Sequence, residues 1–260
     1  MGNRLENSVA IITGASRGIG LSIVKAFADE GASLCLIARN KTTLDDLVPS
    51  LNIQSSKVMT LALDVTDREA CFEAVAAAEK HFGKVDILVN NAGVYRAKPF
   101  LEQTPKDYQD MLDVNLFGVF NFTQACLPNM QGRKKGSIIN IASTAGKWGS
   151  RNQSGYNVSK HAVVGLTRCV ALEASAHKVT VNAICPGFVE TDMLDELKAQ
   201  GSNSAGTSIE DFEKAALARV PLGRMMRPDE IASLAVFLAS KDAQGMTGQS
   251  IHMDGGMVFG

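Results

Sequence analysis

Tyr156 and Lys160 stand four residues apart in the segment Tyr-Asn-Val-Ser-Lys, and Ser143 precedes them at the end of an apolar run. Residues four apart share one face of a helix, so the Lys160 ammonium can lie beside the Tyr156 phenol. A phenol titrates near ~10, too high for an efficient proton donor at neutral pH. One cation at ~4 Å and an effective dielectric of ~20 contributes roughly 4 kcal/mol, or about three pKa units. The pair therefore predicts a tyrosine of lowered pKa that exchanges protons with a substrate, although the spacing alone also fits a solvated helix face.

A glycine-rich loop near the N-terminus is the second chemical element. The uncharged run 9–12 leads directly into Thr-Gly-Ala-Ser-Arg-Gly-Ile-Gly at 13–20, where a helical pattern begins. Strand, glycine loop and helix in this order favour pyrophosphate binding, because glycines allow close backbone approach and a helix N-terminus presents free N–H groups. The spacing is G-x-x-x-G-x-G, not the common G-x-G-x-x-G. The glycine loop alone is weak evidence for pyrophosphate binding. Its position between a strand and a helix strengthens that evidence.

Apolar β-type runs alternate with helical patterns along the whole chain. Strands are predicted at 9–12, 33–38, 57–63, 85–89, 136–142, 179–185 and 249–253. Helices are predicted near 18–30, 67–82, 106–129, 155–176 and 228–240. This alternation predicts an α/β fold, a single-domain Rossmann-type doubly wound parallel sheet of about seven strands with helices on both faces.

One domain, 1–260, accounts for the length of the chain. Within it, the segment 190–218 contains the stretch Gln-Gly-Ser-Asn-Ser-Ala-Gly-Thr-Ser between two short helical pieces. It follows the carboxyl end of a predicted strand, so we interpret it as a mobile substrate lid, with a plain surface insertion as the alternative.

Composition excludes several classes of function. A formal charge of −1 with dispersed Lys and Arg argues against nucleic acid as a partner. No stretch reaches about 18 uncharged apolar residues, so no membrane span is predicted. The start of the chain lacks the apolar region of a secretion signal, and the five cysteines show no C-x-x-C spacing, which together predict a cytoplasmic protein with reduced thiols. The four histidines form no ligand cluster, so no metal site is predicted.

Arg39 follows the second predicted strand, where NAD-binding domains usually place an acid for the ribose 2′-hydroxyl. Arg39 and Arg17 can instead hold a 2′-phosphate, which favours NADP(H) over NAD(H). The alternative for Arg39 is an exposed loop arginine. After the third strand, Asp64 and Val65 can contact the adenine, or Asp64 can cap a helix that starts at Thr66.

Two further polar features fall where a doubly wound fold binds its ligands. Asn90-Asn91-Ala92-Gly93 follows the fourth strand and offers amides and a glycine for close backbone approach. Asn115 is a polar residue among apolar helix positions. A buried amide needs hydrogen-bond partners, and a catalytic relay is one way to supply them.

Together these motifs resemble the short-chain dehydrogenase/reductase family in its one-domain subtype, over essentially the full chain. The resemblance rests on the glycine loop, Asn90-Asn91-Ala92-Gly93, Asn115, Ser143, Tyr156, Lys160, and Pro186-Gly187 followed by Thr191. Within the family the chain is most similar to 3-oxoacyl-carrier-protein reductases and related polyketide ketoreductases, in segments 141–147, 159–166 and 185–193. Secondary-alcohol dehydrogenases share many of these residues.

The resemblance implies a role for each catalytic residue. Ser143 would hydrogen-bond the substrate carbonyl, and Tyr156 would be the general acid in reduction and the base in oxidation. Lys160 would hold the nicotinamide ribose and lower the pKa of Tyr156. Asn115 would hold a water that joins Lys160 to solvent.

The resemblance also implies two sets of binding residues. The cofactor set comprises Gly14, Ser16, Arg17, Gly18, Ile19, Gly20, Arg39, Asp64, Val65, Asn91, Ala92, Gly93, Tyr156, Lys160, Pro186, Gly187, Val189 and Thr191. The substrate set comprises Ser143, Tyr95, Trp148, Gln153, Phe188, Met193 and Leu194, although aromatic and methionine residues are often core instead.

The resemblance extends to possible partners. Carrier-protein reductases place basic residues beside the mouth of the active site, and the counterparts here are Arg133, Lys134, Lys135 and Lys178. A carrier-bound thioester, a CoA thioester and a free ketone all remain open as substrates. The resemblance also implies a homotetramer. Two predicted helices have apolar residues on more than one face, which is compatible with packing between subunits: Phe117, Phe120 and Phe122 on one, and Val163, Val164 and Leu166 on the other. Burial inside one subunit would explain the same residues.

Three functions are consistent with the sequence. The leading hypothesis is an NADPH-dependent ketoreductase acting on a 3-oxoacyl thioester or a similar β-dicarbonyl compound. The second is a secondary-alcohol or hydroxyacid dehydrogenase that uses NAD, against which Arg39 argues. The third is a non-catalytic regulator that senses dinucleotides; such a protein would not need the complete set of Ser143, Tyr156 and Lys160.

Overall fold

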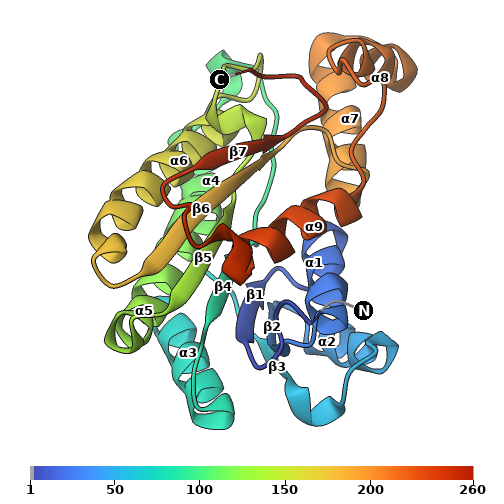
Figure 1. The fold of residues 1–260 in the computed structure, drawn as a ribbon. Coiled ribbons are helices and arrows are strands. Elements are labelled where there is room, and N and C mark those ends of the chain that lie inside the picture. Colours follow the sequence, from blue (N-terminus) through green and yellow to red (C-terminus); the bar gives the residue numbers. More distant parts are fainter. Residues whose placement is uncertain (1–2, 260) are drawn as a thin grey trace.

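A single parallel sheet forms the centre of the molecule, seen in a computed structural model that describes residues 3–259 (Figure 1). Its strands lie in the order β3-β2-β1-β4-β5-β6-β7, and every neighbouring pair is parallel. The strands are β1 (Val9–Thr13), β2 (Ser33–Ala38), β3 (Val58–Ala62), β4 (Ile87–Asn90), β5 (Gly136–Ile141), β6 (Val179–Pro186) and β7 (Ser250–Met253). The order reverses between β1 and β4, so the chain leaves these neighbours toward opposite edges of the sheet, and ligands of such folds bind at the carboxyl ends of the strands there.

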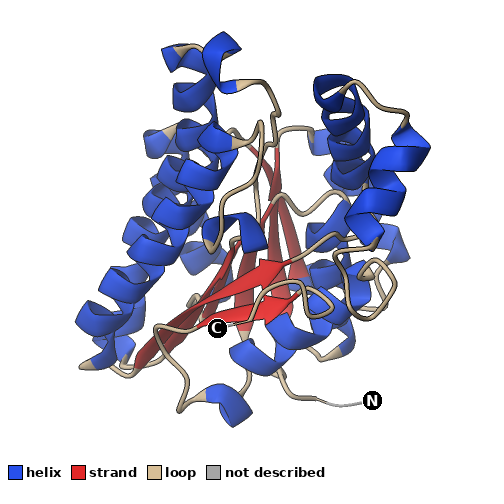
Figure 2. Cartoon of the chain, turned by 90° about the horizontal axis from the view of Figure 1, so that it is seen from above, coloured by secondary structure: helices blue, strands red, loops and turns tan. Residues whose placement is uncertain are grey.

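Helices cover both faces of the sheet (Figure 2). The face with α1 (Gly18–Asp29) and α9 (Pro228–Ala239) also contacts Leu44 of α2 (Lys41–Leu47). The opposite face packs against α3 (Arg68–Phe82), α5 (Gly118–Arg133) and α6 (Ser154–Ser175). The remaining helices are α4 (Pro105–Leu112), which leads through a π-helix over Asp113–Phe117 into α5, and the antiparallel pair α7 (Asp192–Ala205) and α8 (Ile209–Leu217).

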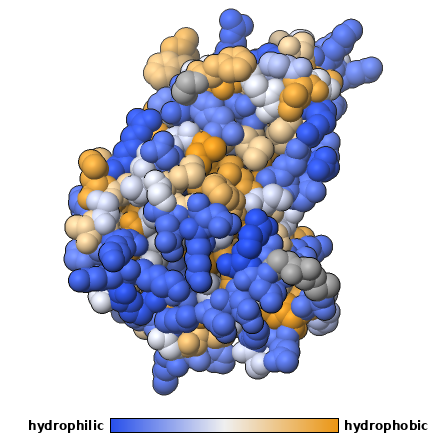
Figure 3. All heavy atoms as spheres, viewed as in Figure 1, coloured by the Kyte–Doolittle hydropathy of each residue, from blue (hydrophilic) through white to orange (hydrophobic). Residues whose placement is uncertain are grey.

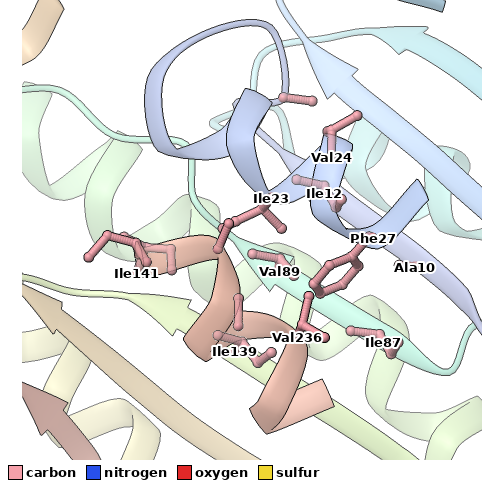
Figure 4. Packing of buried hydrophobic residues seen from close by; sticks show 14 of the residues in the cluster. Ala10, Ile12, Ile23, Val24, Phe27, Ile87, Val89, Ile139, Ile141 and Val236 are labelled. Carbon is pink, nitrogen blue, oxygen red and sulfur yellow. The ribbon is translucent and has the colours of Figure 1, made fainter. Parts of the chain in front are cut away.

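Successive strand residues face opposite sides of the sheet, and for this reason β1, β2 and β4, which are buried on both faces, are largely apolar. In β1, Ala10 and Ile12 belong to the cluster under α1 and α9, whereas Ile11 belongs to the cluster under α3, α5 and α6. Figure 4 shows Phe27 of α1 and Val236 of α9 meeting over the strands. Both faces are therefore closed, and the functional surface is left to the ends of the strands.

The predicted fold class is confirmed: the structure is one α/β unit with seven parallel strands. Each predicted strand and helix is present, with ends that differ by a few residues. The helix predicted over 106–129 is interrupted by the π-helix and continues to Arg133, and α2 was not predicted. Among residues 3–259, no helix is both long and apolar enough to cross a membrane.

The segment interpreted as a lid is a helical hairpin. Its polar stretch does not interrupt the first helix, because α7 continues to Ala205 and ends where Gly206 adopts a φ of 66°. Gly201 faces Phe212 of α8 so closely that a Cβ there would lie 2.4 Å from the ring. The small and polar residues of the stretch therefore allow two helices to pack, rather than marking a loop.

Candidate active site

A cleft of about 450 Å³ lies at the carboxyl ends of the strands. Its walls come from the loops that follow β1 to β6, together with one side of the α7–α8 hairpin. On the face shown in Figure 3, apolar residues gather in the upper half, where Figure 1 places the α7–α8 hairpin and the C-terminal end of the chain. The position of the cleft matches the switch point of the sheet.

Ser143, Tyr156 and Lys160 converge on one wall of this cleft. Ser143 lies two residues after the end of β5, and its side chain caps a 3-10 turn by accepting a hydrogen bond from the Ala145 N–H at 3.1 Å. Tyr156 and Lys160 lie in the first turns of α6, with the Lys160 Nζ 5.8 Å from the centre of the Tyr156 ring. The Lys160 Nζ donates to the Ile141 carbonyl at 2.9 Å, which ties the lysine to the end of β5.

Buried amides hold α6 against the sheet at this place. The Asn90 Nδ2 of β4 donates to the Asn140 Oδ1 of β5 at 2.9 Å, and the Asn140 Nδ2 donates to the Thr167 Oγ1 of α6 at 2.9 Å. All three side chains are almost fully buried. These hydrogen bonds link β4, β5 and α6 and so hold in position the helix that carries Tyr156.

The pKa of Tyr156 departs from its ordinary value in the direction opposite to the one expected. Burial raises the pKa of Tyr156 to about 12, and a hydrogen bond with Ser143 lowers it only in part. Burial also lowers the pKa of Lys160 to about 8, which Cys185 offsets only in part. The expectation for Tyr156 considered the attraction between the two groups alone. Desolvation of both groups, which disfavours either charge, is the larger effect here.

Asn115 lies in the π-helix and is fully buried. Its Oδ1 accepts from the Val94 N–H at 2.8 Å, and its Nδ2 donates to the Val94 carbonyl and the Ser159 hydroxyl, each at 3.0 Å. Both amide hydrogens are therefore engaged. The π-helix turns the amide inward, toward the loop after β4 and α6, which explains a polar residue in an apolar run.

Gly93 separates the amide of Asn115 from the ammonium of Lys160. A Cβ at Gly93 would lie 3.3 Å from the Asn115 Oδ1 and 3.7 Å from the Lys160 Nζ. The absence of a side chain at this position lets both polar atoms face the same small space.

The glycine loop packs closely against the end of β4. Gly14 has a φ of 63°, and a Cβ at Gly20 would lie 2.1 Å from the Gly14 carbonyl oxygen. The Asn91 Nδ2 donates to the Thr13 and Gly14 carbonyls at 3.0 Å each. Thr13 in turn accepts from the Asn91 N–H at 3.0 Å. These contacts leave no room for side chains and fix the loop at the start of α1.

The N-terminus of α1 fits an anionic group. Arg17 occupies the N-cap position without a side-chain cap, and the first turn of α1 contains no acidic residue. Uncapped N–H groups and the helix dipole both favour a phosphate there. The loop residues therefore fit the pyrophosphate of a dinucleotide.

Arg17 and Arg39 line the cleft but differ in their partners. Arg17 lies 3.3 Å from Asp192 and 4.0 Å from Glu196, both on α7, so it links the glycine loop to the hairpin. Arg39 is exposed and has no ion pair within residues 3–259. The expected clamp of two free arginines is therefore reduced to Arg39. Asp64 does not cap a helix at Thr66: its Oδ1 accepts from the Thr66 N–H and hydroxyl at 2.9 Å each, and α3 begins at Arg68 behind Asp67.

Most of the residues named from the sequence line this one cleft. All of the substrate set does so, and so does the cofactor set except Gly20, which lies behind the loop. Asn115 does not reach the cleft either. Phe212, Ala216, Arg219 and Met257 line it and were not predicted. The four-residue spacing of Phe212 and Ala216 in α8 marks one helix face, whereas nothing in the sequence indicates that Arg219 reaches a cleft.

The four basic residues expected beside the mouth lie elsewhere. Arg133 and Lys134 end α5 before β5, and Lys178 directly precedes β6, so they lie at the amino ends of the strands, opposite the cleft. Arg133 is also engaged inside the protein, where it donates to the Asp86 carboxylate at 2.8 Å and to the Val85 carbonyl. The prediction was wrong because sequence proximity to a strand does not show which end of it a residue approaches.

Among residues 3–259 there is no group of three or more His, Cys, Asp or Glu side chains that could hold a metal ion. Of the five cysteines, which are free, Cys169 is exposed and the others are buried.

Comparison with known proteins agrees with this geometry. The family model described as enoyl-(acyl carrier protein) reductase matches residues 14–258. The 3-oxoacyl-[acyl-carrier-protein] reductase FabG of Thermotoga maritima is 39% identical over 256 residues, covering 98% of this chain and 100% of the relative. FabG of Vibrio cholerae is 38% identical over 255 residues, covering 98% and 99%. The oxidoreductase YxjF of Bacillus subtilis is 36% identical over 254 residues, covering 97% and 98%.

The chain belongs to the short-chain dehydrogenase/reductase family. It is an oxidoreductase of the ketoreductase kind that acts on CH–OH and C=O groups with a nucleotide cofactor. Ser143, Tyr156 and Lys160 therefore stand in the cleft of an enzyme of this class.

Proposed function

We propose that the protein is an NADPH-dependent ketoreductase that reduces a 3-oxoacyl thioester or a similar β-dicarbonyl compound. The observation that carries the proposal is the convergence of Ser143, Tyr156 and Lys160 on the wall of a cleft that also contains the glycine loop and Arg39. Relatives named 3-oxoacyl-[acyl-carrier-protein] reductase, matched over almost their whole length, support this choice of substrate.

The residues of the chain divide the work of carbonyl reduction. NADPH, when bound, supplies the hydride. Ser143 donates a hydrogen bond to the substrate carbonyl, and Tyr156 gives its proton to the oxygen as negative charge develops there. With a pKa of about 12, Tyr156 holds its proton throughout the neutral range, as a general acid must. Lys160 holds the ribose, and its charged form stabilises the phenolate that remains.

The space between Asn115 and Lys160 supports a proton relay. A water molecule there would contact the Lys160 Nζ and the Asn115 Oδ1, on either side of Gly93. Since both hydrogens of the Asn115 amide are engaged, Asn115 would accept a hydrogen bond from that water and not donate one. Such a relay returns a proton to Tyr156 after each turnover.

The cofactor preference rests on Arg39. This guanidinium lies at the carboxyl end of β2 without an acidic partner among the described residues, and it suits the 2′-phosphate of NADP(H). We further propose that the α7–α8 hairpin, within 190–218, acts as a lid. The exposed ion pair between Arg17 and Asp192 joins it to the glycine loop, and exposed pairs of this kind are weak enough to open.

A homotetramer is proposed from exposed apolar side chains on neighbouring helices. Phe117, the last residue of the π-helix before α5, is 45% exposed, and Leu172 of α6 is 79% exposed. By contrast, Phe122, Val163 and Val164 pack inside the subunit, so the residues that suggested an interface from the sequence are only partly available for one.

The test is the initial rate of reduction of acetoacetyl-CoA with NADPH and, separately, with NADH. Turnover with NADPH that exceeds turnover with NADH supports both the ketoreductase activity and the role of Arg39. If a protein that binds NADPH reduces neither this thioester nor simple keto esters, the ketoreductase proposal is rejected. NAD-dependent oxidation of a secondary alcohol in the same preparation would then identify a dehydrogenase.

A further inference from the structure

Two arginines line the substrate end of the cleft, away from the glycine loop. Arg151 belongs to the loop before α6, and Arg219 follows α8. Neither forms an ion pair with an acid among residues 3–259, whereas Arg17, which also lines the cleft, is paired with Asp192. The substrate end of the cleft therefore carries positive charge that the described part of the protein leaves unbalanced.

Arg219 is held in a defined position. Its guanidinium carbon lies 4.1 Å from the centre of the Trp148 ring, the distance of a close cation–π contact. Trp148 is itself anchored, because the Asn157 Nδ2 donates to the Trp148 carbonyl at 2.7 Å and Asn157 neighbours the catalytic Tyr156 on α6. The backbone N–H of Arg219 donates to the Ala216 carbonyl at 3.1 Å.

The contact with Trp148 uses the face of the guanidinium and not its edge. The N–H groups of an arginine point outward in the plane of the group, so stacking leaves them free for a planar, two-point contact with a carboxylate or phosphate. Arg219 is exposed, yet partial desolvation lowers its pKa from the ordinary value. A guanidinium that has lost some of its water and has no acidic partner gains more from an anionic ligand than a fully solvated one.

The arrangement spans the cleft. Trp148 stands on the wall that carries Ser143 and Tyr156, and Arg219 stands on the wall formed by the hairpin. A substrate whose carbonyl meets Ser143 and Tyr156 therefore extends between these walls. The rest of the cleft in this part is apolar, with Phe188, Leu197 and Phe212 among its lining residues, which suits the acyl portion of such a molecule.

We propose that Arg219, held against Trp148, binds an anionic group on the substrate and thereby selects charged over neutral carbonyl compounds. The anion is a phosphate or a carboxylate: the phosphate of a phosphopantetheine arm in a thioester, or the carboxylate of a free oxoacid. The inference deepens the proposed ketoreductase function and depends on it for the identity of the reacting group. The binding of the anion itself can be measured without turnover.

Binding to the protein saturated with NADP⁺ tests the proposal by calorimetry. One pair of probes is 4′-phosphopantetheine against pantetheine, and the other is acetoacetate against methyl acetoacetate. The variants are Arg219→Gln, Arg219→Lys and, as a control for the loss of one positive charge, Arg168→Gln. Arg168 is exposed on α6 and does not line the cleft. Thermal melts verify that each variant is folded.

The wild type should bind the charged member of one pair about tenfold or more tightly than its neutral counterpart, the size of a charge-assisted contact. Arg219→Gln should abolish this preference, Arg219→Lys should retain part of it, and Arg168→Gln should keep it. Loss of preference in the phosphate pair identifies a thioester arm, and loss in the carboxylate pair identifies an oxoacid. Equal weakening of charged and neutral probes, or no effect of Arg219→Gln on either pair, would overturn the proposal.

Turnover separates this inference from the proposed function. Reduction of methyl acetoacetate by NADPH is the uncharged reference: Arg219→Gln should lower kcat/KM for the charged keto compound by a larger factor than kcat/KM for this ester. If the wild type reduces no keto compound but still shows the Arg219-dependent preference in binding, the ketoreductase proposal fails and the anion site stands. If the wild type reduces acetoacetyl-CoA and Arg219→Gln does so equally well, with binding also unchanged, the anion site fails and the ketoreductase proposal stands.

Discussion

The lowered pKa of Lys160 predicts that NADPH binding weakens as the pH rises. Lys160 has a pKa of about 8, so its ammonium is present below that pH and is lost above it. The ratio of protonated to neutral Lys160 falls from about ten to one at pH 7 to about one to ten at pH 9. If the ammonium holds the ribose, the contact contributes about 1.5–3 kcal/mol, equivalent to a factor of about 10–150 in Kd. The Kd for NADPH should therefore rise by about tenfold or more between pH 7 and pH 9.5.

Titration of NADPH fluorescence at constant ionic strength measures this dependence in the wild type and in two lysine variants. In Lys160→Met the Kd for NADPH should be larger than in the wild type at pH 7 and nearly independent of pH across the same range. Lys25→Met is the matched control, since Lys25 is an exposed residue of α1 outside the cleft, and it should reproduce the wild-type dependence. A wild-type Kd that changes less than about threefold, or a Lys160→Met variant that keeps the full rise, would refute the reasoning.

Replacing Tyr156 with Phe should lower kcat by roughly 100-fold or more with NADPH affinity largely retained, as steady-state rates and fluorescence titration would show; normal turnover would reject Tyr156 as the acid. Arg39→Asp should weaken NADPH binding and reduce the preference for NADPH over NADH, measured as the ratio of the two kcat/KM values. An unchanged ratio would show that residues other than Arg39 determine the cofactor preference. Gly93→Ala fills the space between Asn115 and Lys160, so steady-state turnover should fall while the first hydride transfer, followed by stopped flow, stays fast; equal slowing of both would argue against a relay. Asp86→Asn removes the negative charge of the 3% exposed side chain that pairs with Arg133, which should lower the free energy of urea unfolding by about 3 kcal/mol at pH 7. Because the pKa of Asp86 is lowered in the folded state, this difference should shrink as the pH falls below about 4.

Patterns that act along the chain predicted the fold well. Parallel strands buried on both faces are nearly continuous apolar runs, as β1 and β2 are. The catalytic residues could also be predicted from the sequence, because the four-residue spacing on a helix and the glycine loop are patterns of neighbouring residues. Ser143, Tyr156 and Lys160 come together in the cleft for this reason.

Properties that depend on distant contacts were not predictable. The partner of Arg133 is Asp86, far away in the sequence, and only the packed structure shows that this arginine is engaged. Arg17 likewise pairs with Asp192 of α7, a helix whose position beside the glycine loop no local sequence pattern indicates. The predicted lowering of the Tyr156 pKa was wrong for the same reason, because burial depends on the whole fold, whereas the spacing to Lys160 is local.

The two shifted pKa values of the catalytic pair determine the protonation form from which reduction and oxidation start. Burial keeps Tyr156 protonated through the neutral range and makes Lys160 easier to deprotonate, so the protein alone holds a neutral acid beside the cleft. Carbonyl reduction begins from that form, since the phenol must donate a proton. Alcohol oxidation would need the phenolate, and removing a proton from a group of pKa about 12 at pH 7 costs roughly 7 kcal/mol. Nearby positive charge, including that of protonated Lys160, must offset this cost in both directions, because reduction ends with the same phenolate from which oxidation begins.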